Sequence, residues 1–119
     1  MRFKKFDSLC LRREFLLVQR GGARFSSRVG VLMVKPNALG TCRVGFTVSR
    51  KVGNAVVRNR VKRRLRDVVC REAASLCLGC DHVFVSYAGI VRTDYRVLRE
   101  IVQGLLEQAG QWASDSRSW

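Results

Sequence analysis

The chain has 119 residues, a formal net charge of +14 and a hydrophobic fraction of 47%. This length suits one domain, residues 1–119, with one modest core, and the apolar content excludes a disordered basic tail. So large a positive charge favours a nucleic acid or an anionic membrane as partner. The membrane is disfavoured because no apolar run approaches the roughly 20 residues that span a bilayer.

Residues 1–7 are basic and aromatic, with no apolar segment behind the charges that would make a signal peptide. We expect a flexible arm here and a cytoplasmic protein whose five cysteines are reduced thiols. Cys77 and Cys80 have the CxxC spacing, but no second pair follows. His82, the single histidine, is too close to complete an ordinary zinc site, so a metal or redox function is disfavoured.

A first helix is predicted from Asp7 or Ser8, either of which can cap it, to about Arg20. Gly21-Gly22 ends this helix. Phe15 lies on its apolar side and has two interpretations, a core residue or a partly exposed ring at the edge of a sheet.

Two strands are predicted next, at residues 29–34 and 42–49, joined by a turn that contains Pro, Asn and Gly. Because the connection is short, we expect these strands to pair in antiparallel fashion. In the second strand, Val44, Phe46 and Val48 share one face. The opposite face is small and polar and is open either to a ligand or to water; it carries Arg43, Gly45, Thr47 and Ser49.

A helix dense in Arg and Lys follows the Gly53-Asn54 break, with Asn54 as candidate N-cap, and is predicted to run to about Leu76. One stripe of it is apolar: Val57, Val61, Leu65, Val68, Val69 and Leu76. The rest is polar: Asn59, Arg60, Lys62, Arg63, Arg64 and Arg66, with Arg58 at the margin.

An ordinary solvated helix face would interleave acids with these bases at i,i+4 spacing, but only Asp67 and Glu72 are present. Crowded guanidinium groups repel one another, and a polyanion relieves that repulsion. Arginine suits phosphates because its planar fork donates two charge-assisted hydrogen bonds at once. We therefore expect this face to contact nucleic acid.

The chain closes with a strand at 81–87 and a helix from Tyr95 to about Ala109, and residues 110–119 are expected to be frayed and flexible. The predicted order is α-β-β-α-β-α, with one extra strand left open. The fold class is α+β, a small mixed sheet with helices packed on one side of it. The strand–basic helix–strand unit is a βαβ crossover, which the general rule makes right-handed.

The sequence offers no catalytic constellation of its own. Acids are few and scattered, His82 lies in a predicted strand, and neither a Walker loop nor GxGxxG occurs. As an independent protein the chain is predicted to bind RNA or DNA. The absence of a helix-turn-helix spacing disfavours DNA.

Residues 44–66, VGFTVSRKVGNAVVRNRVKRRLR, resemble the signature of the bacterial ribonuclease P protein component. The core of this run, Lys-Val-Gly-Asn-Ala-Val-x-Arg-Asn-Arg-x-Lys-Arg, is long and unusual in composition, and the resemblance covers about residues 6–108. It implies a protein that binds ribonuclease P RNA and helps it cleave the 5′ leader from precursor tRNA. The Mg²⁺ would be held by that RNA, with no nucleophile from the protein. The resemblance also implies a left-handed crossover, against the general rule.

The alternative is an RNA-binding protein of ribosomal type without an enzymatic role. Such a protein would account for the charge, the size and the basic helix equally well. It would not account for the Gly-Asn-Ala-Val and Arg-Asn-Arg run.

Carried over by position, the resemblance assigns residues to two sites. Contacts to the catalytic RNA fall on Lys51, Asn54, Arg58, Asn59, Arg60, Lys62, Arg63 and Arg66, with Gly53 in the turn into the helix. The cleft for the single-stranded leader, between the first helix and the sheet, takes Phe15, Ser49 and Arg50. Gln19 and Met33 stand where relatives often have aromatic rings, and Tyr87 stands where they often have Arg.

Overall fold

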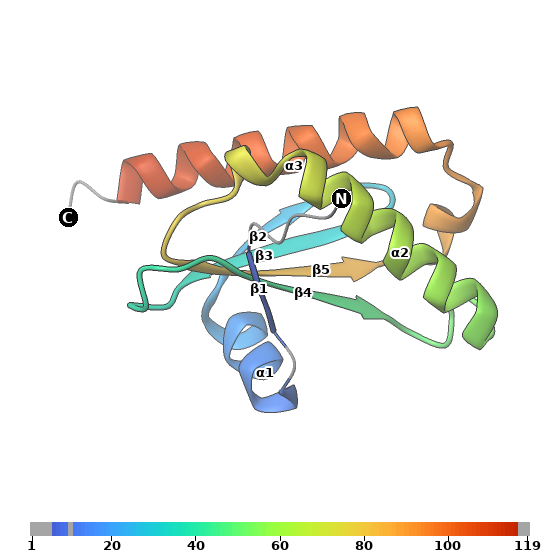
Figure 1. Cartoon of the computed structure of the whole chain (residues 1–119), viewed down its shortest axis with the longest axis horizontal. Helices are drawn as coiled ribbons and strands as arrows, with labels where there is room; N and C mark the ends of the chain where they lie inside the picture. The colour runs from blue at the N-terminus through green and yellow to red at the C-terminus, as the bar shows by residue number, and fades with distance from the viewer. Residues whose placement is uncertain (1–5, 10, 117–119) are drawn as a thin grey trace.

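The computed structural model describes residues 6–9 and 11–116, which form a five-stranded sheet with helices on both faces (Figure 1). The strands are β1 (Asp7–Ser8), β2 (Ala23–Ser26), β3 (Gly30–Pro36), β4 (Arg43–Val48) and β5 (Cys80–Ser86). The helices are α1 (Arg12–Gly21), α2 (Ala55–Arg71) and α3 (Tyr95–Ser116), with 3₁₀ turns η1 (Ala73–Ser75) and η2 (Ala88–Arg92). The α+β class and the mixed sheet are as predicted.

The sheet order is β1-β4-β5-β3-β2, so β5 separates the two strands that were expected to pair. It runs antiparallel to β3 and parallel to β4. The prediction that β3 and β4 pair directly is therefore wrong. The physical reason lies in β5, whose Val83 and Phe84 are both buried although they face opposite sides of the sheet. A strand that is apolar on both faces belongs at the centre.

The start of the chain also differs from the prediction. Asp7 and Ser8 do not cap a helix; they form β1, in which the Asp7 N–H donates to the Cys42 carbonyl at 2.9 Å. Phe6 is buried, so the predicted flexible arm is wrong for residues 6–7, and residues 1–5 lie outside the described part. β2 is a further strand, so the sheet has two strands beyond the predicted three, where the sequence had left only one open.

Helices cover both faces of the sheet, not one: α2 and α3 lie on one side and α1 on the other (Figure 1). The alternation along β3 shows why. Leu32 and Val34 belong to the larger core beneath α2 and α3, whereas Val31 and Met33 belong to a smaller core beneath α1. Because β3 and β5 present apolar side chains on both faces, one layer of helices cannot bury them all.

The β4–α2–β5 crossover is left-handed. In Figure 1 the chain leaves β4 to the right, returns through α2 above the sheet, and enters β5 behind β4. The expectation from the general rule is wrong here, and that from the family resemblance is right. A right-handed connection would lay α2 on the face of Gly45 and Thr47, which offers little apolar surface. The observed hand places α2 over Val44 and Val48.

Two helices end at residues other than those predicted from the sequence. α2 stops at Arg71 rather than near Leu76. α3 continues to Ser116, so the predicted frayed tail is wrong for residues 110–116. The Trp112 ring meets the Phe25 ring edge-on, with centroids 6.3 Å apart, and Ala113 is buried, so apolar contacts hold this last segment.

None of the helices in the described part has the length and apolar character that crossing a membrane requires.

Candidate nucleic-acid interface

A tight turn leads from β4 into α2. The Asn54 side chain accepts a hydrogen bond from the Val57 N–H at 3.0 Å, so Asn54 is the predicted N-cap. At Gly53, a Cβ atom would lie 2.8 Å from Val57 Cγ1, which leaves room for glycine only. The cap and the close approach together set where the helix begins and which side of it faces the sheet.

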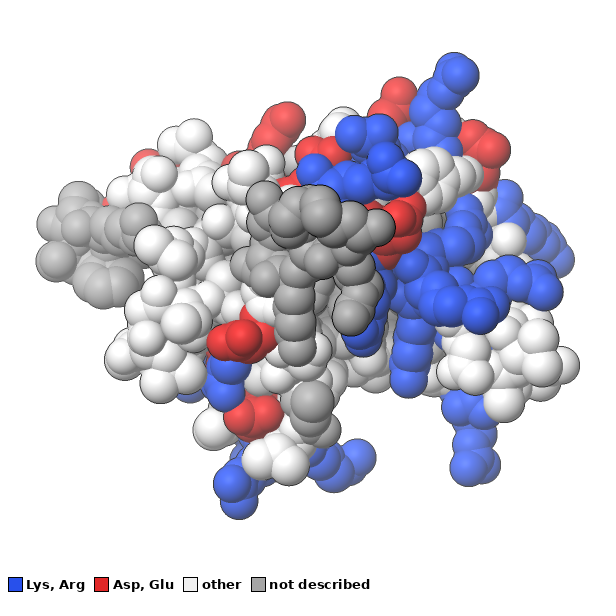
Figure 2. All heavy atoms as spheres, viewed as in Figure 1, with Lys and Arg blue, Asp and Glu red and all other residues white. Residues whose placement is uncertain are grey.

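The two sides of α2 separate as its sequence predicts. Val61, Leu65, Val68 and Val69 are buried against the sheet and α3. Seven exposed polar residues of the turn and of α2 are together called the basic face: Lys51, Asn54, Asn59, Arg60, Lys62, Arg63 and Arg66. Figure 2 shows blue Lys and Arg side chains gathered over this helix. In α2 itself, seven Arg and Lys residues stand against one Asp, so the field above the face is strongly positive.

Three arginines of α2 have partners or burial that set them apart. Arg64 is half-buried and donates from Nη2 to the Thr93 carbonyl at 2.5 Å, so it holds the segment before α3. Arg58, at the predicted margin, is half-buried, and its Nε has no hydrogen-bond partner among the described residues. The Arg66 guanidinium lies 5.8 Å from the centre of the Phe46 ring, a cation–π distance, and Arg66 is exposed.

The acids beside the basic face are already engaged. Asp67 accepts hydrogen bonds from the Tyr95 hydroxyl at 2.6 Å and from Arg71 Nε at 3.2 Å. The Tyr95 bond is the main reason that the pKa of Asp67 lies below its usual value. Glu72 pairs with Arg99 at 3.2 Å. Through Tyr95 and Arg99, these acids link the end of α2 to α3.

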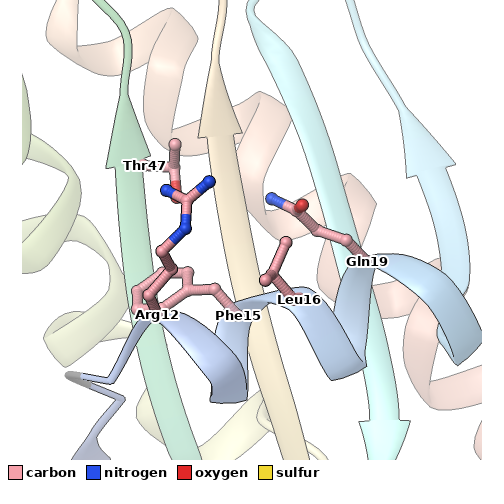
Figure 3. A pocket seen from close by; sticks show the side chains of 5 residues that line it. All are labelled: Arg12, Phe15, Leu16, Gln19 and Thr47. Carbon is pink, nitrogen blue, oxygen red and sulfur yellow. The ribbon is translucent and has the colours of Figure 1, made fainter.

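A second site lies on the opposite face of the sheet, where α1 crosses β4. A Cβ atom at Gly45 would lie 2.5 Å from Phe15 Cζ, so the ring rests directly on the strand backbone. Phe15 is half-buried and also borders an open cavity of about 300 Å³. The lining of this cavity, which we call the cleft, is Arg12, Phe15, Leu16, Gln19 and Thr47 (Figure 3). Both interpretations of Phe15 therefore hold in part.

The cleft contains one of the three residues predicted for it. Ser49 and Arg50 are exposed just beyond β4 and do not line it. Met33 is buried in the smaller core, and Tyr87 is exposed and outside the cavity. Arg12, Leu16 and Thr47 line the cleft but are not among the residues predicted for it. A signal was present, because Thr47 shares the face of Gly45, and Arg12, Leu16 and Gln19 follow one another at helical spacing around Phe15.

The histidine and its neighbouring cysteines form part of the core. His82 is fully buried, and its Nε2 accepts the Cys77 N–H at 3.1 Å while its Nδ1 lies 3.5 Å from Cys42 Sγ. Burial raises the pKa of the Cys42 thiol to about 12. Among residues 6–9 and 11–116, no three His, Cys, Asp or Glu side chains come together as metal ligands.

Comparisons with known proteins agree with this architecture. The family model for ribonuclease P matches residues 3–110. The ribonuclease P protein component of Citrifermentans bemidjiense is 42% identical over 93 residues, 78% of this chain and 79% of the relative. That of Caldanaerobacter subterraneus subsp. tengcongensis is 34% identical over 114 residues, 96% of this chain and 98% of the relative.

The solved structure of the ribonuclease P protein from Thermotoga maritima superposes with a TM-score of 0.78 at 30% identity. The superposition covers 86% of this chain and 96% of that one. The protein from Staphylococcus aureus has the same fold, with a TM-score of 0.78 at 22% identity over 86% of this chain and 94% of the other. The chain described here belongs to the ribonuclease P protein family.

Proposed function

We propose that this protein binds the catalytic RNA of ribonuclease P through the basic face of α2 and holds the 5′ leader of precursor tRNA in the cleft beside α1. In this role it assists the endonucleolytic removal of the leader in the cytoplasm. The observation that carries the proposal is the basic face itself, which lies within the sequence run that resembles the family signature, on a helix whose seven Arg and Lys residues stand against one Asp.

Two features of the basic face support its contact with the catalytic RNA. Its cations are exposed, so phosphates can approach them from solvent. They also stand on a helix fixed by the Asn54 cap and by packing on the sheet, so their spacing is set before the RNA arrives. Phosphate neutralisation by such groups releases counterions and contributes much of the affinity for nucleic acids.

The cleft has the ingredients of a site for single-stranded RNA. Phe15 supplies an aromatic surface, and Arg12, Gln19 and Thr47 supply polar groups around it (Figure 3). Basic grooves with aromatic platforms bind single strands because every base can stack on a ring. Ser49 and Arg50 lie beyond the cavity, where they would meet a leader that runs on past the end of β4.

The chemistry of cleavage would belong to the RNA, with Mg²⁺ held there activating the attacking water. The acids nearest the basic face, Asp67 and Glu72, are bonded to Tyr95, Arg71 and Arg99, so they are poorly placed to act as metal ligands or bases. The contribution of the protein is to bind and to orient its two RNA partners.

The direct test adds the purified protein to bacterial ribonuclease P RNA at low Mg²⁺ and follows cleavage of precursor tRNA. We expect the protein to stimulate cleavage and to show none when it is rigorously free of RNA. Absence of stimulation would favour an RNA-binding protein of ribosomal type. Cleavage by RNA-free protein would contradict the assignment of the chemistry to the RNA.

A further inference from the structure

Arg43 joins α1 to the sheet through two carboxylates. Its Nη1 donates to Glu14 Oε2 of α1 at 2.6 Å. Its Nε and Nη2 donate to Asp81 Oδ1 and Oδ2 of β5 at 2.8 and 2.7 Å. The contact with Asp81 is therefore bidentate, a fork of two hydrogen bonds that defines the plane of the guanidinium as well as its distance from the carboxylate.

Both carboxylates are also held from their other sides. Glu14 Oε1 accepts the Leu11 N–H at 3.2 Å, an otherwise unsatisfied donor at the start of α1. Asp81 Oδ1 accepts a second bond from Asn37 Nδ2 at 2.8 Å. A continuous series of polar contacts thus runs from the loop after β3, through β5 and β4, to the first turn of α1. We call these four residues, Asn37, Asp81, Arg43 and Glu14, the clamp.

The other contacts of α1 do not set its angle so tightly. Only Val18 of this helix is fully buried, in a small core with Leu9, Val31, Met33 and Val83. Apolar packing of this kind has little directional preference. The clamp fixes the first turn of the helix at Glu14, and the immediate neighbour of Glu14, Phe15, lines the cleft. A small rotation of α1 about the sheet would therefore move the Phe15 ring relative to Thr47 across the cavity.

Arg43 is poorly suited to bind phosphate itself. Two carboxylates face one cation, so the local charge is negative, and its side chain is only 22% exposed. A phosphate would have to displace bonds that are already short and charge-assisted. The remaining role for Arg43 is structural: it fixes Glu14 and Asp81, the residues that it bonds, and so the shape of the cleft.

We propose that Arg43 is a positioning residue for leader binding, whose fork on Asp81 and bond to Glu14 set the angle of α1 and so the shape of the cleft. This inference rests on the proposed function, in which the cleft holds the leader. It predicts that the geometry of the guanidinium matters and not its charge alone, because a lysine at this position would keep the charge but lose the fork.

The test uses Arg43→Lys in the holoenzyme reconstituted with ribonuclease P RNA. The measured quantity is the leader gain, the ratio of the dissociation constant for mature tRNA to that for precursor tRNA with a leader of several nucleotides. We expect Arg43→Lys to reduce the leader gain by about five-fold, comparable with the loss of one weak stacking contact. Affinity for mature tRNA and for the catalytic RNA should stay unchanged. Arg13→Lys, at an exposed α1 position outside the cleft, is the matched control and should leave the leader gain unaltered.

A second variant, Glu14→Gln, separates positioning from general destabilisation. If the clamp acts as a unit, the double variant Glu14→Gln with Arg43→Lys should lose no more leader gain than the larger single loss. An unchanged leader gain in both single variants, or equal losses for precursor and mature tRNA, would overturn the proposal. Phe15→Ala distinguishes a failure of the clamp role from a failure of the cleft assignment. If it abolishes the leader gain while the clamp variants do not, only the clamp role fails; if it too has no effect, the cleft assignment fails with it.

Discussion

At the scale of single residues, the contact of Phe15 with Gly45 determines the shape of the cleft. The absence of a side chain at Gly45 lets the ring lie on β4 with one part buried and another part bordering the cavity. A ring held in this way loses little conformational entropy when a base stacks on it. The same contact explains why this strand position is small in a sheet otherwise rich in branched residues.

Phe15→Ala should therefore weaken binding of precursor tRNA to the holoenzyme while mature tRNA binding hardly changes. Base stacking on a ring contributes about 1–3 kcal/mol, and we expect an effect near the lower end because no other residue that lines the cleft is aromatic. The measurement is the ratio of the two dissociation constants, after circular dichroism has confirmed a folded variant. Equal losses for both tRNAs, or a molten variant, would return Phe15 to a purely structural role.

Asp81 should make stability depend on acid pH. Burial opposes its ionisation, but the hydrogen bonds from Arg43 and Asn37 outweigh burial, so its pKa lies below its usual value. A lowered pKa contributes stability above the unfolded-state value, and this is lost as the pH falls through the folded-state value. Asp81→Asn should thus be less stable at pH 7 and show a flatter decline in unfolding free energy below about pH 4. Parallel pH profiles for the two proteins, from urea unfolding, would contradict this.

At the scale of the element, α2 combines a buried apolar stripe with a basic face, and its seven Arg and Lys residues stand against one Asp. The stripe explains why the helix is stable in spite of charge repulsion among its arginines, because packing on the sheet opposes that repulsion. RNA phosphates would relieve it further. The affinity for RNA should accordingly respond steeply to salt.

Arg60→Ala with Arg63→Ala should weaken binding to the catalytic RNA and reduce the slope of log affinity against log salt by about one to two. Both side chains are exposed, so the fold should be retained. Arg64→Ala serves as contrast, because Arg64 bonds the Thr93 carbonyl and its loss should affect stability more than the salt slope. A slope identical to that of the unaltered protein in the double variant would refute the assignment of the basic face.

The last turns of α3 are a structural part of the domain. Trp112 packs against Phe25 of β2, which lies at the sheet edge farthest from β1. Trp112→Ala should lower the free energy of unfolding by about 2 kcal/mol, less than for a fully buried ring because Trp112 is half-buried. Gln111→Ala, at an exposed neighbouring position, is the control. Equal stability of the two variants in urea would mean that the packing of this segment contributes little.

At the scale of the whole molecule, the sheet separates the two proposed RNA sites. α2 lies on one face and α1 on the other, with separate hydrophobic clusters beneath them (Figure 1). The same protein can therefore contact two RNA segments at once without competition between them. Strand β4 connects the sites, because it supplies Gly45 and Thr47 to the cleft and continues directly into the turn before α2.

The effects of substitutions at the two sites should therefore be separable. Arg60→Ala should weaken affinity for the catalytic RNA and leave the leader gain unchanged. Phe15→Ala should reduce the leader gain and leave the affinity for the catalytic RNA unchanged. In the double variant, each of these two changes should stay within about 0.5 kcal/mol of its value in the single variant, because the two sites share no contacts. Strong coupling in the double variant would show that the catalytic RNA reaches the cleft or that β4 transmits a shift.

The sequence by itself determined the features that depend on local spacing. The 3.6-residue period of α2 identified its buried stripe and its basic face, the alternation along β4 identified the small, polar side on which Phe15 rests, and Asn54 was recognisable as a cap. Residues 44–66 also carried the family resemblance. Each of these signals comes from residues close together in the chain, so it can be read without knowledge of distant contacts.

The tertiary structure alone decided how these elements meet. Neither the place of β5 between β3 and β4 nor the hand of the crossover is written in a local period, because each depends on which arrangement buries both faces of β5. The same holds for α1 on the opposite face, for the use of Arg64 on Thr93 and for the fork of Arg43 on Asp81, 38 residues away. Such contacts join residues far apart in the chain, and their free energy exists only once the sheet has formed.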